Sequence, residues 1–328
     1  MPLVLTRKDV ESLLTMKETM KVVEDAFREL AQGTADMPLR TVIRLKKYGG
    51  LINFMPGYLG DMDALAIKVV SGYPDNPKKY NIPTILATIL VHDPATGALQ
   101  AIMDGAWITA MRTGAVSGVA TKYLAREDAE TVGVFGTGVQ AKTQLMAMKE
   151  VRKLKGIKAF DIVQENAKRF SQEMTQQLGI GVVPVNDAAA VVNGSHILIA
   201  ASTSKVPLFD GHLLKDGVHI NGIGSHHGPG VKELDETTIK RAKVVVDQRE
   251  AALKEAGDII DPISKGVITA DHIYAELGEL VTGKKKGRTS PNEITLFKSV
   301  GLAVQDVSTA TRVYELAKAK GIGRTVEV

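Results

Sequence analysis

The spacing of apolar and polar residues predicts a sheet-rich first part of the chain. Apolar positions recur at helical spacing and end at Gly33, which predicts one helix after a short first strand. The four segments that follow are rich in β-branched residues and bounded by Gly or Pro: TVIRL, LINFMPG, ALAIKVVSGYP and PTILATILVHD. Residues 93–97, DPATG, are typical of a hairpin turn. We therefore expect an antiparallel or mixed sheet here.

The pattern changes at residue 107, where a helix of small residues is predicted to extend to residue 124. Beyond it, apolar strands alternate with amphipathic helices, as in TVGVFG followed by VQAKTQLMAMKEVR and KAFDIV followed by ENAKRFSQEMTQQLG. Further predicted strands are GVVPV, HILIAAS, HINGIG, AKVVVD and EITLFKSVG. Such alternation is typical of a doubly wound parallel sheet. The last helix, LAVQDVSTATRVYELAKAKG, has an apolar face and is expected to pack on the first domain.

The fold prediction is α/β: a Rossmann doubly wound parallel sheet plus a second α+β domain. A chain of 328 residues is more than one hydrophobic core usually organises, so two domains are favoured. We assign residues 129–302 to the Rossmann domain and residues 1–128 with 303–328 to the other. A cleft is expected between the two domains.

Composition excludes several classes of function. Cysteine is absent, which removes disulfides, thiolate nucleophiles and Cys-ligated metals. The net charge is only +4, and the one dense basic run, residues 284–288, is expected to be a solvated loop, so nucleic acid is an unfavoured partner. Charges at residues 7–9 interrupt any signal-like segment, and no apolar run reaches the roughly 18 residues of a membrane span. We expect a cytoplasmic protein without membrane contact.

A glycine pattern predicts a dinucleotide site. In VFGTGVQA, Gly136 allows the tight turn, Gly138 lets the backbone approach a pyrophosphate, and the small Ala141 allows close helix packing. The alternative is a strand-to-helix turn without ligand. The candidate cofactor-binding residues of this motif are Gly136, Thr137, Gly138, Val139, Gln140 and Ala141.

An acidic residue predicts which dinucleotide is bound. Asp161 ends the next strand, 25 positions after Gly136, close to the expected offset of about 20. Its carboxylate would accept hydrogen bonds from the ribose hydroxyls and repel a 2′-phosphate, and residues 162–164 include no arginine. We therefore expect NAD(H) rather than NADP(H). Ser202 and Thr203, at another strand end, either line the adenosine or pyrophosphate or form a polar loop.

Two cations stand in unusual settings. Lys68 interrupts the apolar segment ALAIKVVSG, and Arg112 interrupts the small-residue helix WITAMRTGAVSGVA. Burying an unpaired cation is costly, so both should be paired, snorkelling or directed into the cleft. For Lys68 alone, an outward-facing strand position is the alternative.

Taken together, the motifs resemble the ornithine cyclodeaminase and mu-crystallin family almost end to end. The resemblance rests on MPLRTVIRL, IKVVSGYPDNP, IPTILATILV, AMRTGA, VGVFGTGVQA, HINGIGSHHGPGVKELD and EITLFKSVGLAVQD. That family includes ornithine cyclodeaminases, archaeal-type alanine dehydrogenases and ketimine reductases, which use a nicotinamide cofactor and are generally dimers. The resemblance implies a homodimer whose α+β domain binds substrate and forms the dimer contact.

The resemblance also implies the substrate site. Arg40, Lys68 and Arg112 would surround the substrate carboxylate and its imine or amine, with Thr84 beside them. Arginine suits a carboxylate because its planar fork donates two parallel hydrogen bonds, whereas Lys68 offers a mobile proton. The weaker candidates for shaping the nicotinamide and substrate pocket are Asn221, Ser299 and Gly301.

The loop SHHGPG departs from the family. Cyclodeaminases and alanine dehydrogenases typically carry an aspartate shortly before this Pro-Gly, and in the cyclodeaminases it is the expected acid or base. His227 stands in its place here, whereas other members carry a Ser-His that matches Ser225 and His226. Metal ligation is disfavoured because neighbouring loop side chains seldom converge on one ion. A plain surface loop and acid-base chemistry remain, and we favour the latter because imidazole titrates near neutrality.

The missing aspartate favours a simpler reaction than cyclodeamination. We expect an NAD-dependent oxidoreductase that interconverts a small 2-oxo or 2-imino acid and an L-amino acid, like alanine dehydrogenase or a ketimine reductase. Lys68, His226 or His227 would handle the proton. One alternative is ornithine cyclodeaminase, which converts L-ornithine to L-proline and ammonia. Another is a non-catalytic nicotinamide-binding protein of the mu-crystallin type.

Overall fold

The computed structural model describes residues 1–224 and 228–327 and contains two compact units. The first unit comprises Met1–Arg112 with Leu302–Val328, and the second comprises Thr113–Gly301. The helix α4 (Gly105–Leu124) begins in the first unit and ends in the second. The predicted border at residue 128 lies a short way beyond the end of this helix.

The first unit is built on a mixed eight-stranded sheet. Its strands are β1 (Leu3–Leu5), β2 (Ala35–Asp36), β3 (Thr41–Leu45), β4 (Gly50–Leu59), β5 (Ala64–Gly72), β6 (Ile85–His92), β7 (Leu99–Asp104) and β16 (Arg324–Thr325). They lie in the order β16-β1-β7-β6-β5-β4-β2, with β3 also paired to β4. Only β1 and β7 pair in parallel among the described strands of this sheet. The prediction of a mixed sheet is confirmed.

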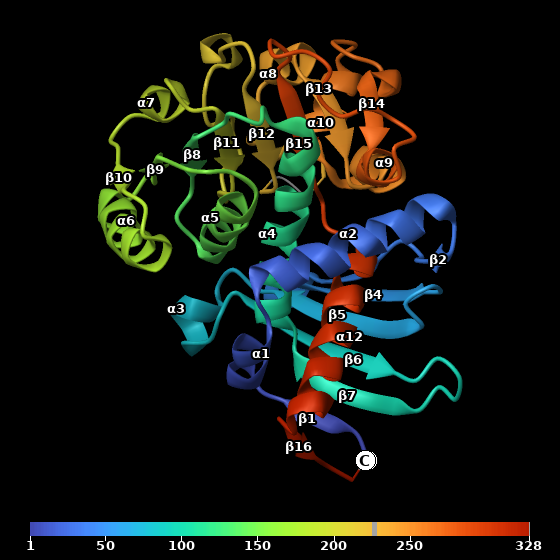
Figure 1. The fold of residues 1–328 in the computed structure, drawn as a ribbon. Coiled ribbons are helices and arrows are strands. Elements are labelled where there is room, and N and C mark those ends of the chain that lie inside the picture. Colours follow the sequence, from blue (N-terminus) through green and yellow to red (C-terminus); the bar gives the residue numbers. More distant parts are fainter. Residues whose placement is uncertain (225–227, 328) are drawn as a thin grey trace. The chain divides into compact units, whose positions relative to one another are not determined.

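Helices cover one face of this sheet. They are α1 (Arg7–Leu13), α2 (Met16–Gln32) and α12 (Ala303–Lys320), and the unit also contains α3 (Asn76–Tyr80) and the 3-10 helix η1 (Lys46–Tyr48). The helix α12 crosses the strands (Figure 1) and contacts β4, β5 and β6, as expected from its apolar face. Beneath it, one buried row runs across four strands and consists of Met55, Lys68, Ile89 and Met103.

The second unit is a doubly wound parallel sheet. Its strands are β8 (Thr131–Phe135), β9 (Gly156–Phe160), β10 (Val182–Pro184), β11 (Ile197–Ala200), β12 (His219–Gly222), β13 (Lys243–Val246), β14 (Ile273–Glu276) and β15 (Thr295–Lys298). The order is β10-β9-β8-β11-β12-β15-β13-β14, with all these pairs parallel. The order reverses beside β8, which is the topological switch point where such sheets bind ligands. The Rossmann prediction is confirmed.

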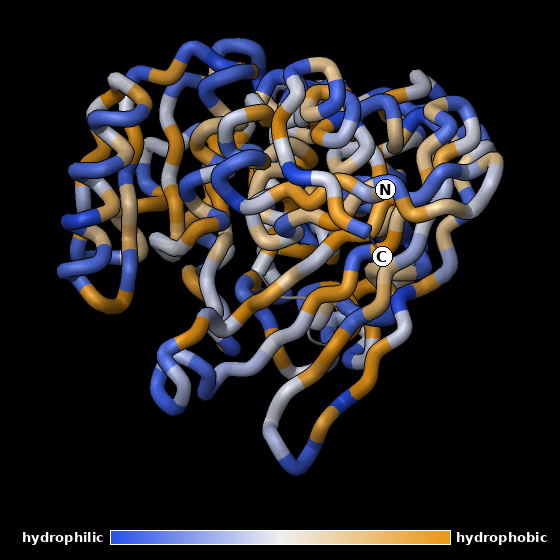
Figure 2. The backbone as a smooth tube through the Cα atoms, turned by 90° about the horizontal axis from the view of Figure 1, so that it is seen from below, coloured by the Kyte–Doolittle hydropathy of each residue, from blue (hydrophilic) through white to orange (hydrophobic). Residues whose placement is uncertain are grey.

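The helices of this unit flank the sheet. They are α5 (Val139–Val151), α6 (Gln164–Leu178), α7 (Ala188–Val192), α8 (Glu236–Arg241), α9 (Arg249–Glu255), α10 (Gly257–Ser264), α11 (Leu277–Val281), η2 (Gly211–Leu213) and η3 (Ala270–His272). The elements between residues 249 and 281 were not predicted. Hydropathy colouring follows the elements, with hydrophobic stretches along strands and hydrophilic turns (Figure 2).

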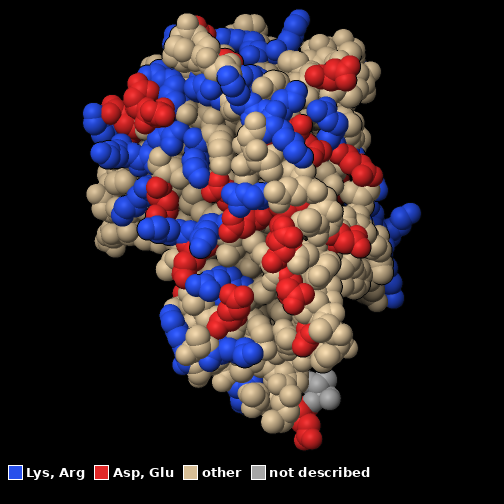
Figure 3. All heavy atoms as spheres, turned by 45° about the vertical axis from the view of Figure 1, so that its right-hand side comes forward, with Lys and Arg blue, Asp and Glu red and all other residues tan. Residues whose placement is uncertain are grey.

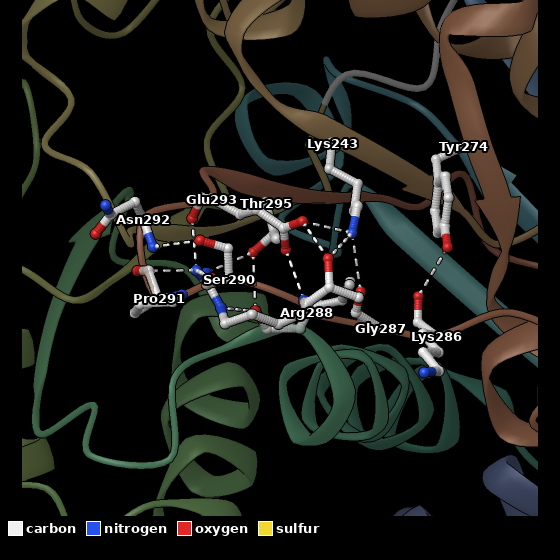
Figure 4. A network of polar contacts seen from close by, with 12 residues as sticks. Lys243, Tyr274, Lys286, Gly287, Arg288, Ser290, Pro291, Asn292, Glu293 and Thr295 are labelled. Carbon is white, nitrogen blue, oxygen red and sulfur yellow. Dashed lines mark hydrogen bonds and ion pairs between the residues drawn. The ribbon is translucent and has the colours of Figure 1, made fainter.

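The basic run at residues 284–288 is only partly a solvated loop. Its three lysines are exposed, but Arg288 is half-buried. The Arg288 guanidinium donates to the Leu124 carbonyl at the end of α4 (2.8 Å) and to Thr295 Oγ1 (3.1 Å). Lys243 joins the same network through Glu293 (2.7 Å), as Figure 4 shows. Arg288 is therefore a structural cap, because cations near a helix C-terminus satisfy its last carbonyls.

The surface of the protein mixes both signs of charge. On the face drawn in Figure 3, acidic side chains stand among the lysines and arginines. Among the described helices, none combines the length and the apolar character needed to cross a membrane.

Candidate active site

The first unit buries two cations around one carboxylate. Lys68 in β5 lies 2.6 Å from Asp306 Oδ2, and Arg112 Nε donates to Asp306 Oδ1 at 3.0 Å. The side chains of Lys68 and Asp306 are each 1% exposed and that of Arg112 is 8% exposed. Sequence analysis predicted both cations but not Asp306. The carboxylate comes from the N-terminal turn of α12, whose dipole helps to offset the cost of burying an anion.

Gln305 is a second unpredicted member of this cluster. Its Oε1 accepts from Arg112 Nη1 at 2.6 Å and from the Leu302 backbone N–H at 3.3 Å. Its Nε2 is buried and has no hydrogen-bond partner among the described residues. Two of the five N–H groups of Arg112 are thus used by Gln305 and Asp306, which leaves three for a ligand. The polar pair Gln-Asp within the apolar segment LAVQDV was the available sequence signal.

The surroundings of Lys68 change its proton affinity. Burial and the nearby positive charge of Arg112 lower the pKa of Lys68 from 10.5 to about 7, although Asp306 acts in the opposite direction. Arg40, just before β3, adds a smaller lowering effect on the same pKa. Lys68 can therefore exchange a proton near neutral pH, as a general acid or base requires.

The structure connects Arg40 and Thr84 to this cluster to different degrees. Arg40 is close enough to influence Lys68 electrostatically. Thr84 lies just before β6, where its carbonyl accepts from the Tyr73 N–H at 2.8 Å. No hydrogen bond between described residues joins Thr84 to Lys68 or Arg112, and its predicted role in substrate binding stays a prediction.

The glycine turn of the second unit has the geometry of a dinucleotide cradle. Gly136 has a φ of 86°, and a Cβ there would come within 2.5 Å of the Ala201 carbonyl, so this position needs glycine. A Cβ on Gly138 would meet no protein atom within 4 Å, which leaves open space before α5. No side chain caps α5, so its first N–H groups remain for an anion. Ala141 is fully buried, as close helix packing requires.

Asp161 lies directly beside this turn. Its Oδ2 accepts from Thr137 Oγ1 at 2.6 Å and its Oδ1 accepts from the Val163 N–H at 2.9 Å. The Gly136 N–H also donates to the Phe160 carbonyl at 2.9 Å, so the turn and the end of β9 are fixed together. The carboxylate oxygens keep lone pairs for ribose hydroxyls. The open helix end, the open side of Gly138 and this carboxylate together fit a dinucleotide.

Ser202, at the end of β11, is already engaged by an unpredicted residue. Its N–H and Oγ both donate to Glu233 Oε1, at 2.7 and 2.5 Å, and Gly224 N–H donates to Glu233 Oε2 at 2.8 Å. Glu233 is fully buried, and burial raises the pKa of its carboxyl. The role predicted for Ser202 and Thr203 in cofactor binding stays a prediction.

The three residues predicted to shape the nicotinamide and substrate pocket, Asn221, Ser299 and Gly301, are buried and hydrogen-bonded within the protein. Asn221 is fully buried and its amide donates to Thr121 Oγ1 at 2.9 Å. Ser299 Oγ and the Gly301 N–H donate to Asp247 Oδ2, at 2.9 and 2.8 Å. Asp247 was not predicted, and it fixes the segment that follows β15. The pocket-shaping roles of Asn221, Ser299 and Gly301 stay predictions, and His226 and His227 lie outside the described residues.

Comparison with known proteins decides the family. The profile of the ornithine cyclodeaminase/mu-crystallin family matches residues 1–321. The chain belongs to this family. The chain is also similar to "Ketimine reductase mu-crystallin" of Macropus fuliginosus. The two sequences are 34% identical over 96% of this chain and 97% of that protein. The predicted family is confirmed.

Solved structures agree with this membership. The Δ1-pyrroline-2-carboxylate reductase of Thermococcus litoralis, in complex with NADH and L-proline, superimposes with a TM-score of 0.96 at 51% identity, covering 99% of this chain and 100% of that one. An archaeal alanine dehydrogenase dimer with bound NAD gives a TM-score of 0.93 at 39% identity, covering 99% of each chain. These relatives match the predicted class, nicotinamide-dependent oxidoreductases of amino and imino acids.

Proposed function

We propose that this protein is an NAD-dependent oxidoreductase that interconverts a small 2-imino acid and the corresponding L-amino acid. The observation that carries the proposal is the buried cluster of Lys68, Arg112 and Asp306. The cyclic ketimine Δ1-pyrroline-2-carboxylate is the first substrate to test, because the Thermococcus litoralis reductase named for it is 51% identical. A cytoplasmic location stays a prediction.

The charge of the cluster favours a carboxylate ligand. Arg112 and protonated Lys68 carry two positive charges against the one carboxylate of Asp306. Buried charges are stable only when they are paired, so this surplus is best balanced by an anionic substrate. Arg112 retains three N–H groups for that substrate, enough for a bidentate contact.

The second unit would hold the cofactor. The open N-terminus of α5 and the backbone at Gly138 would bind the pyrophosphate, and Asp161 would accept from the ribose hydroxyls. The same carboxylate would repel a 2′-phosphate, which favours NAD(H). When bound, NADH supplies a hydride to the imine carbon.

Lys68 would supply the proton. In the reductive direction the C=N bond gains hydride at carbon, and Lys68 Nζ gives a proton to the nitrogen, yielding the amine. Lys68 then recovers a proton from solvent. A pKa of about 7 suits this exchange, because an acid works best when its pKa lies near the operating pH. His226 and His227 remain alternative proton carriers.

We further propose that two copies of the chain associate through the sheet face opposite α12. On that face a cross-strand apolar row is only half-buried and consists of Pro56, Ile67, Leu90 and Ile102. Exposed Ile43 and Leu86, which the strand register places on the same face, extend the apolar surface. Apolar area of this kind is typical of association surfaces, and the related archaeal alanine dehydrogenase is a dimer. Sedimentation as a monomer at micromolar concentration would contradict this proposal.

The experiment that tests the activity follows NADH absorbance. Purified protein is supplied with Δ1-pyrroline-2-carboxylate and, separately, with pyruvate plus ammonium. Loss of NADH with either substrate supports the proposal, and the ratio of the two kcat/KM values identifies the better substrate. A parallel reaction with L-ornithine and NAD⁺ is assayed for proline. Proline without net NADH change would indicate cyclodeamination instead, and NADH binding without any turnover would indicate a binding protein.

A further inference from the structure

We propose that Asp306 is the positioning residue of this site: its two oxygens hold Lys68 and Arg112 side by side, and its charge keeps the Lys68 proton available. The second half of this inference rests on the proposed function, in which Lys68 is the proton donor. Asp306 itself is not assigned to touch the substrate.

The geometry carries the first step. Each oxygen of the Asp306 carboxylate serves a different cation, Oδ2 at 2.6 Å from Lys68 Nζ and Oδ1 at 3.0 Å from Arg112 Nε. The two cations come from different elements, β5 and α4, and would repel each other without the carboxylate between them. Asp306 therefore fixes both the separation and the orientation of the two cations.

The charged surroundings of Lys68 carry the second step. Three charged groups act on it: Arg112 from α4, Asp306 from α12 and Arg40 from the segment before β3. Its cross-strand neighbours in β4 and β6 are the apolar Met55 and Ile89. Of the three charged groups, Asp306 alone favours the protonated ammonium, while the two arginines and burial oppose it.

An isosteric substitution separates charge from shape. In Asp306→Asn the side chain keeps its volume, but the amide has one oxygen and one NH2 group, so one of the two cations must face a donor. The negative charge is also lost. Both changes should make the Lys68 proton easier to remove.

A matched control exists in the same unit. Glu29 in α2 is 4% exposed and accepts from the Asp61 and Met62 backbone N–H groups at 2.9 and 3.0 Å. Glu29→Gln therefore also converts a buried carboxylate to an amide, but at a place that has no contact with the cluster among the described residues. It should affect folding stability without affecting Lys68.

The first experiment measures the pH profile of kcat/KM for imine reduction. If Lys68 must be protonated, activity falls as the pH rises through its pKa. In Asp306→Asn this fall should move to lower pH by about one unit or more, whereas Glu29→Gln should match the wild type. An unmoved profile in Asp306→Asn, or an equal shift in Glu29→Gln, would overturn the inference.

The second experiment needs no turnover. Lys68 loses its proton in the folded state near pH 7 but keeps it in the unfolded chain up to about pH 10.4, so it makes the free energy of unfolding rise with pH within that window. Urea unfolding of the wild type and Lys68→Met, compared between pH 6 and 9, isolates this rise.

The same comparison is then made with Asp306→Asn and the double variant Lys68→Met/Asp306→Asn. The rise should begin at lower pH in the Asp306→Asn background, and an unchanged onset would overturn the inference. If Asp306→Asn does not fold, Asp306→Glu, which keeps the charge, should preserve the wild-type onset, and a displaced onset there would count against the charge argument. A shifted onset in a protein that reduces no imino acid would defeat the proposed function alone.

Discussion

Each unit buries one lysine in a strand, and the two lysines have different surroundings. Lys68 shares a single carboxylate with Arg112, so its cluster carries surplus positive charge. Lys298 in β15 is fully buried 2.8 Å from Asp258 Oδ2. Glu233 lies close enough to feel the Lys298 charge, although burial raises the pKa of the Glu233 carboxyl overall. The second cluster thus contains two carboxyl groups for one lysine.

Backbone N–H groups donate hydrogen bonds to the carboxyl groups of the second cluster, whereas no backbone N–H group of the described residues donates to Asp306 in the first. Asp258 Oδ1 accepts from the N–H groups of Glu233 and Leu234, at 2.8 and 3.0 Å. Glu233 itself accepts from the N–H groups of Ser202 and Gly224. These donors stabilise the second carboxyl group without a ligand. The comparison predicts that a buried lysine by itself does not mark a functional site, whereas an excess of charge that backbone groups leave unpaired does.

Arg112→Ala should produce the largest change. It removes the guanidinium proposed to bind the substrate carboxylate, so kcat/KM should fall by about three to four orders of magnitude. NADH affinity, measured by fluorescence titration, should stay within about twofold because the dinucleotide cradle belongs to the other unit. The control is Arg312→Ala, also in the first unit, whose surface pairs contribute little. Full activity in Arg112→Ala would disprove the carboxylate clamp.

Substituting the two lysines tests the comparison directly. Lys298→Met leaves buried carboxylates without their cation and should cost about 3 to 5 kcal/mol of unfolding free energy. Lys68→Met leaves Asp306 paired with Arg112 and should cost less than about 1 kcal/mol, while imine reduction is lost. Urea unfolding at pH 7 with kcat measurements distinguishes them. Equal loss of unfolding free energy in both variants would contradict the proposed difference between the Lys298 cluster and the Lys68 cluster.

The proposed cofactor preference rests on Asp161. Asp161→Ser removes the repulsion of a 2′-phosphate, so the ratio of kcat/KM with NADH to that with NADPH should fall by about ten- to a hundredfold. Glu165→Ser, a nearby exposed carboxylate, should leave the ratio within about twofold. Comparable use of both cofactors by the wild type would show that Asp161 does not discriminate.

Two glycines of the same turn should separate folding from binding. Gly138→Ala adds a methyl group to open space at an ordinary φ of −79°, so stability should hold while the dissociation constant of NADH rises about tenfold. Gly136→Ala meets the Ala201 carbonyl at a positive φ and should lose about 1 to 3 kcal/mol of stability. Thermal melts with and without NADH measure both effects. Unchanged NADH affinity in Gly138→Ala would argue against pyrophosphate binding there.

The sequence patterns of neighbouring residues correctly predicted several elements of the fold. The strand, glycine turn and helix around Gly136, the mixed sheet and the packing of α12 all follow from short-range periodicity. The segment from residue 249 to 281 was missed because its helices are short and α10 contains Pro262, so no helical period develops.

Partners far apart in the sequence could not be predicted. ALAIKVVSG and EITLFKSVG both place a lysine in an apolar strand, yet only Lys68 was predicted to be functional. The difference depends on Asp306 and Asp258, which no spacing rule connects to these strands. Glu233 and Asp247 were missed for the same reason, since their partners are mainly backbone N–H groups that any sequence supplies.

The discontinuous first unit also has a consequence for how the protein is made. Strands β1 to β7 are synthesised before residues 113–301, but α12, which covers the buried row with Met55 and Ile89, follows only after them. At a synthesis rate of about 5–20 residues per second, this apolar face of the sheet stays uncovered for roughly ten to forty seconds. The nascent chain therefore passes through a stage in which the sheet can attract chaperones or other chains, and Lys68 meets Asp306 only after residues 113–301 have been synthesised.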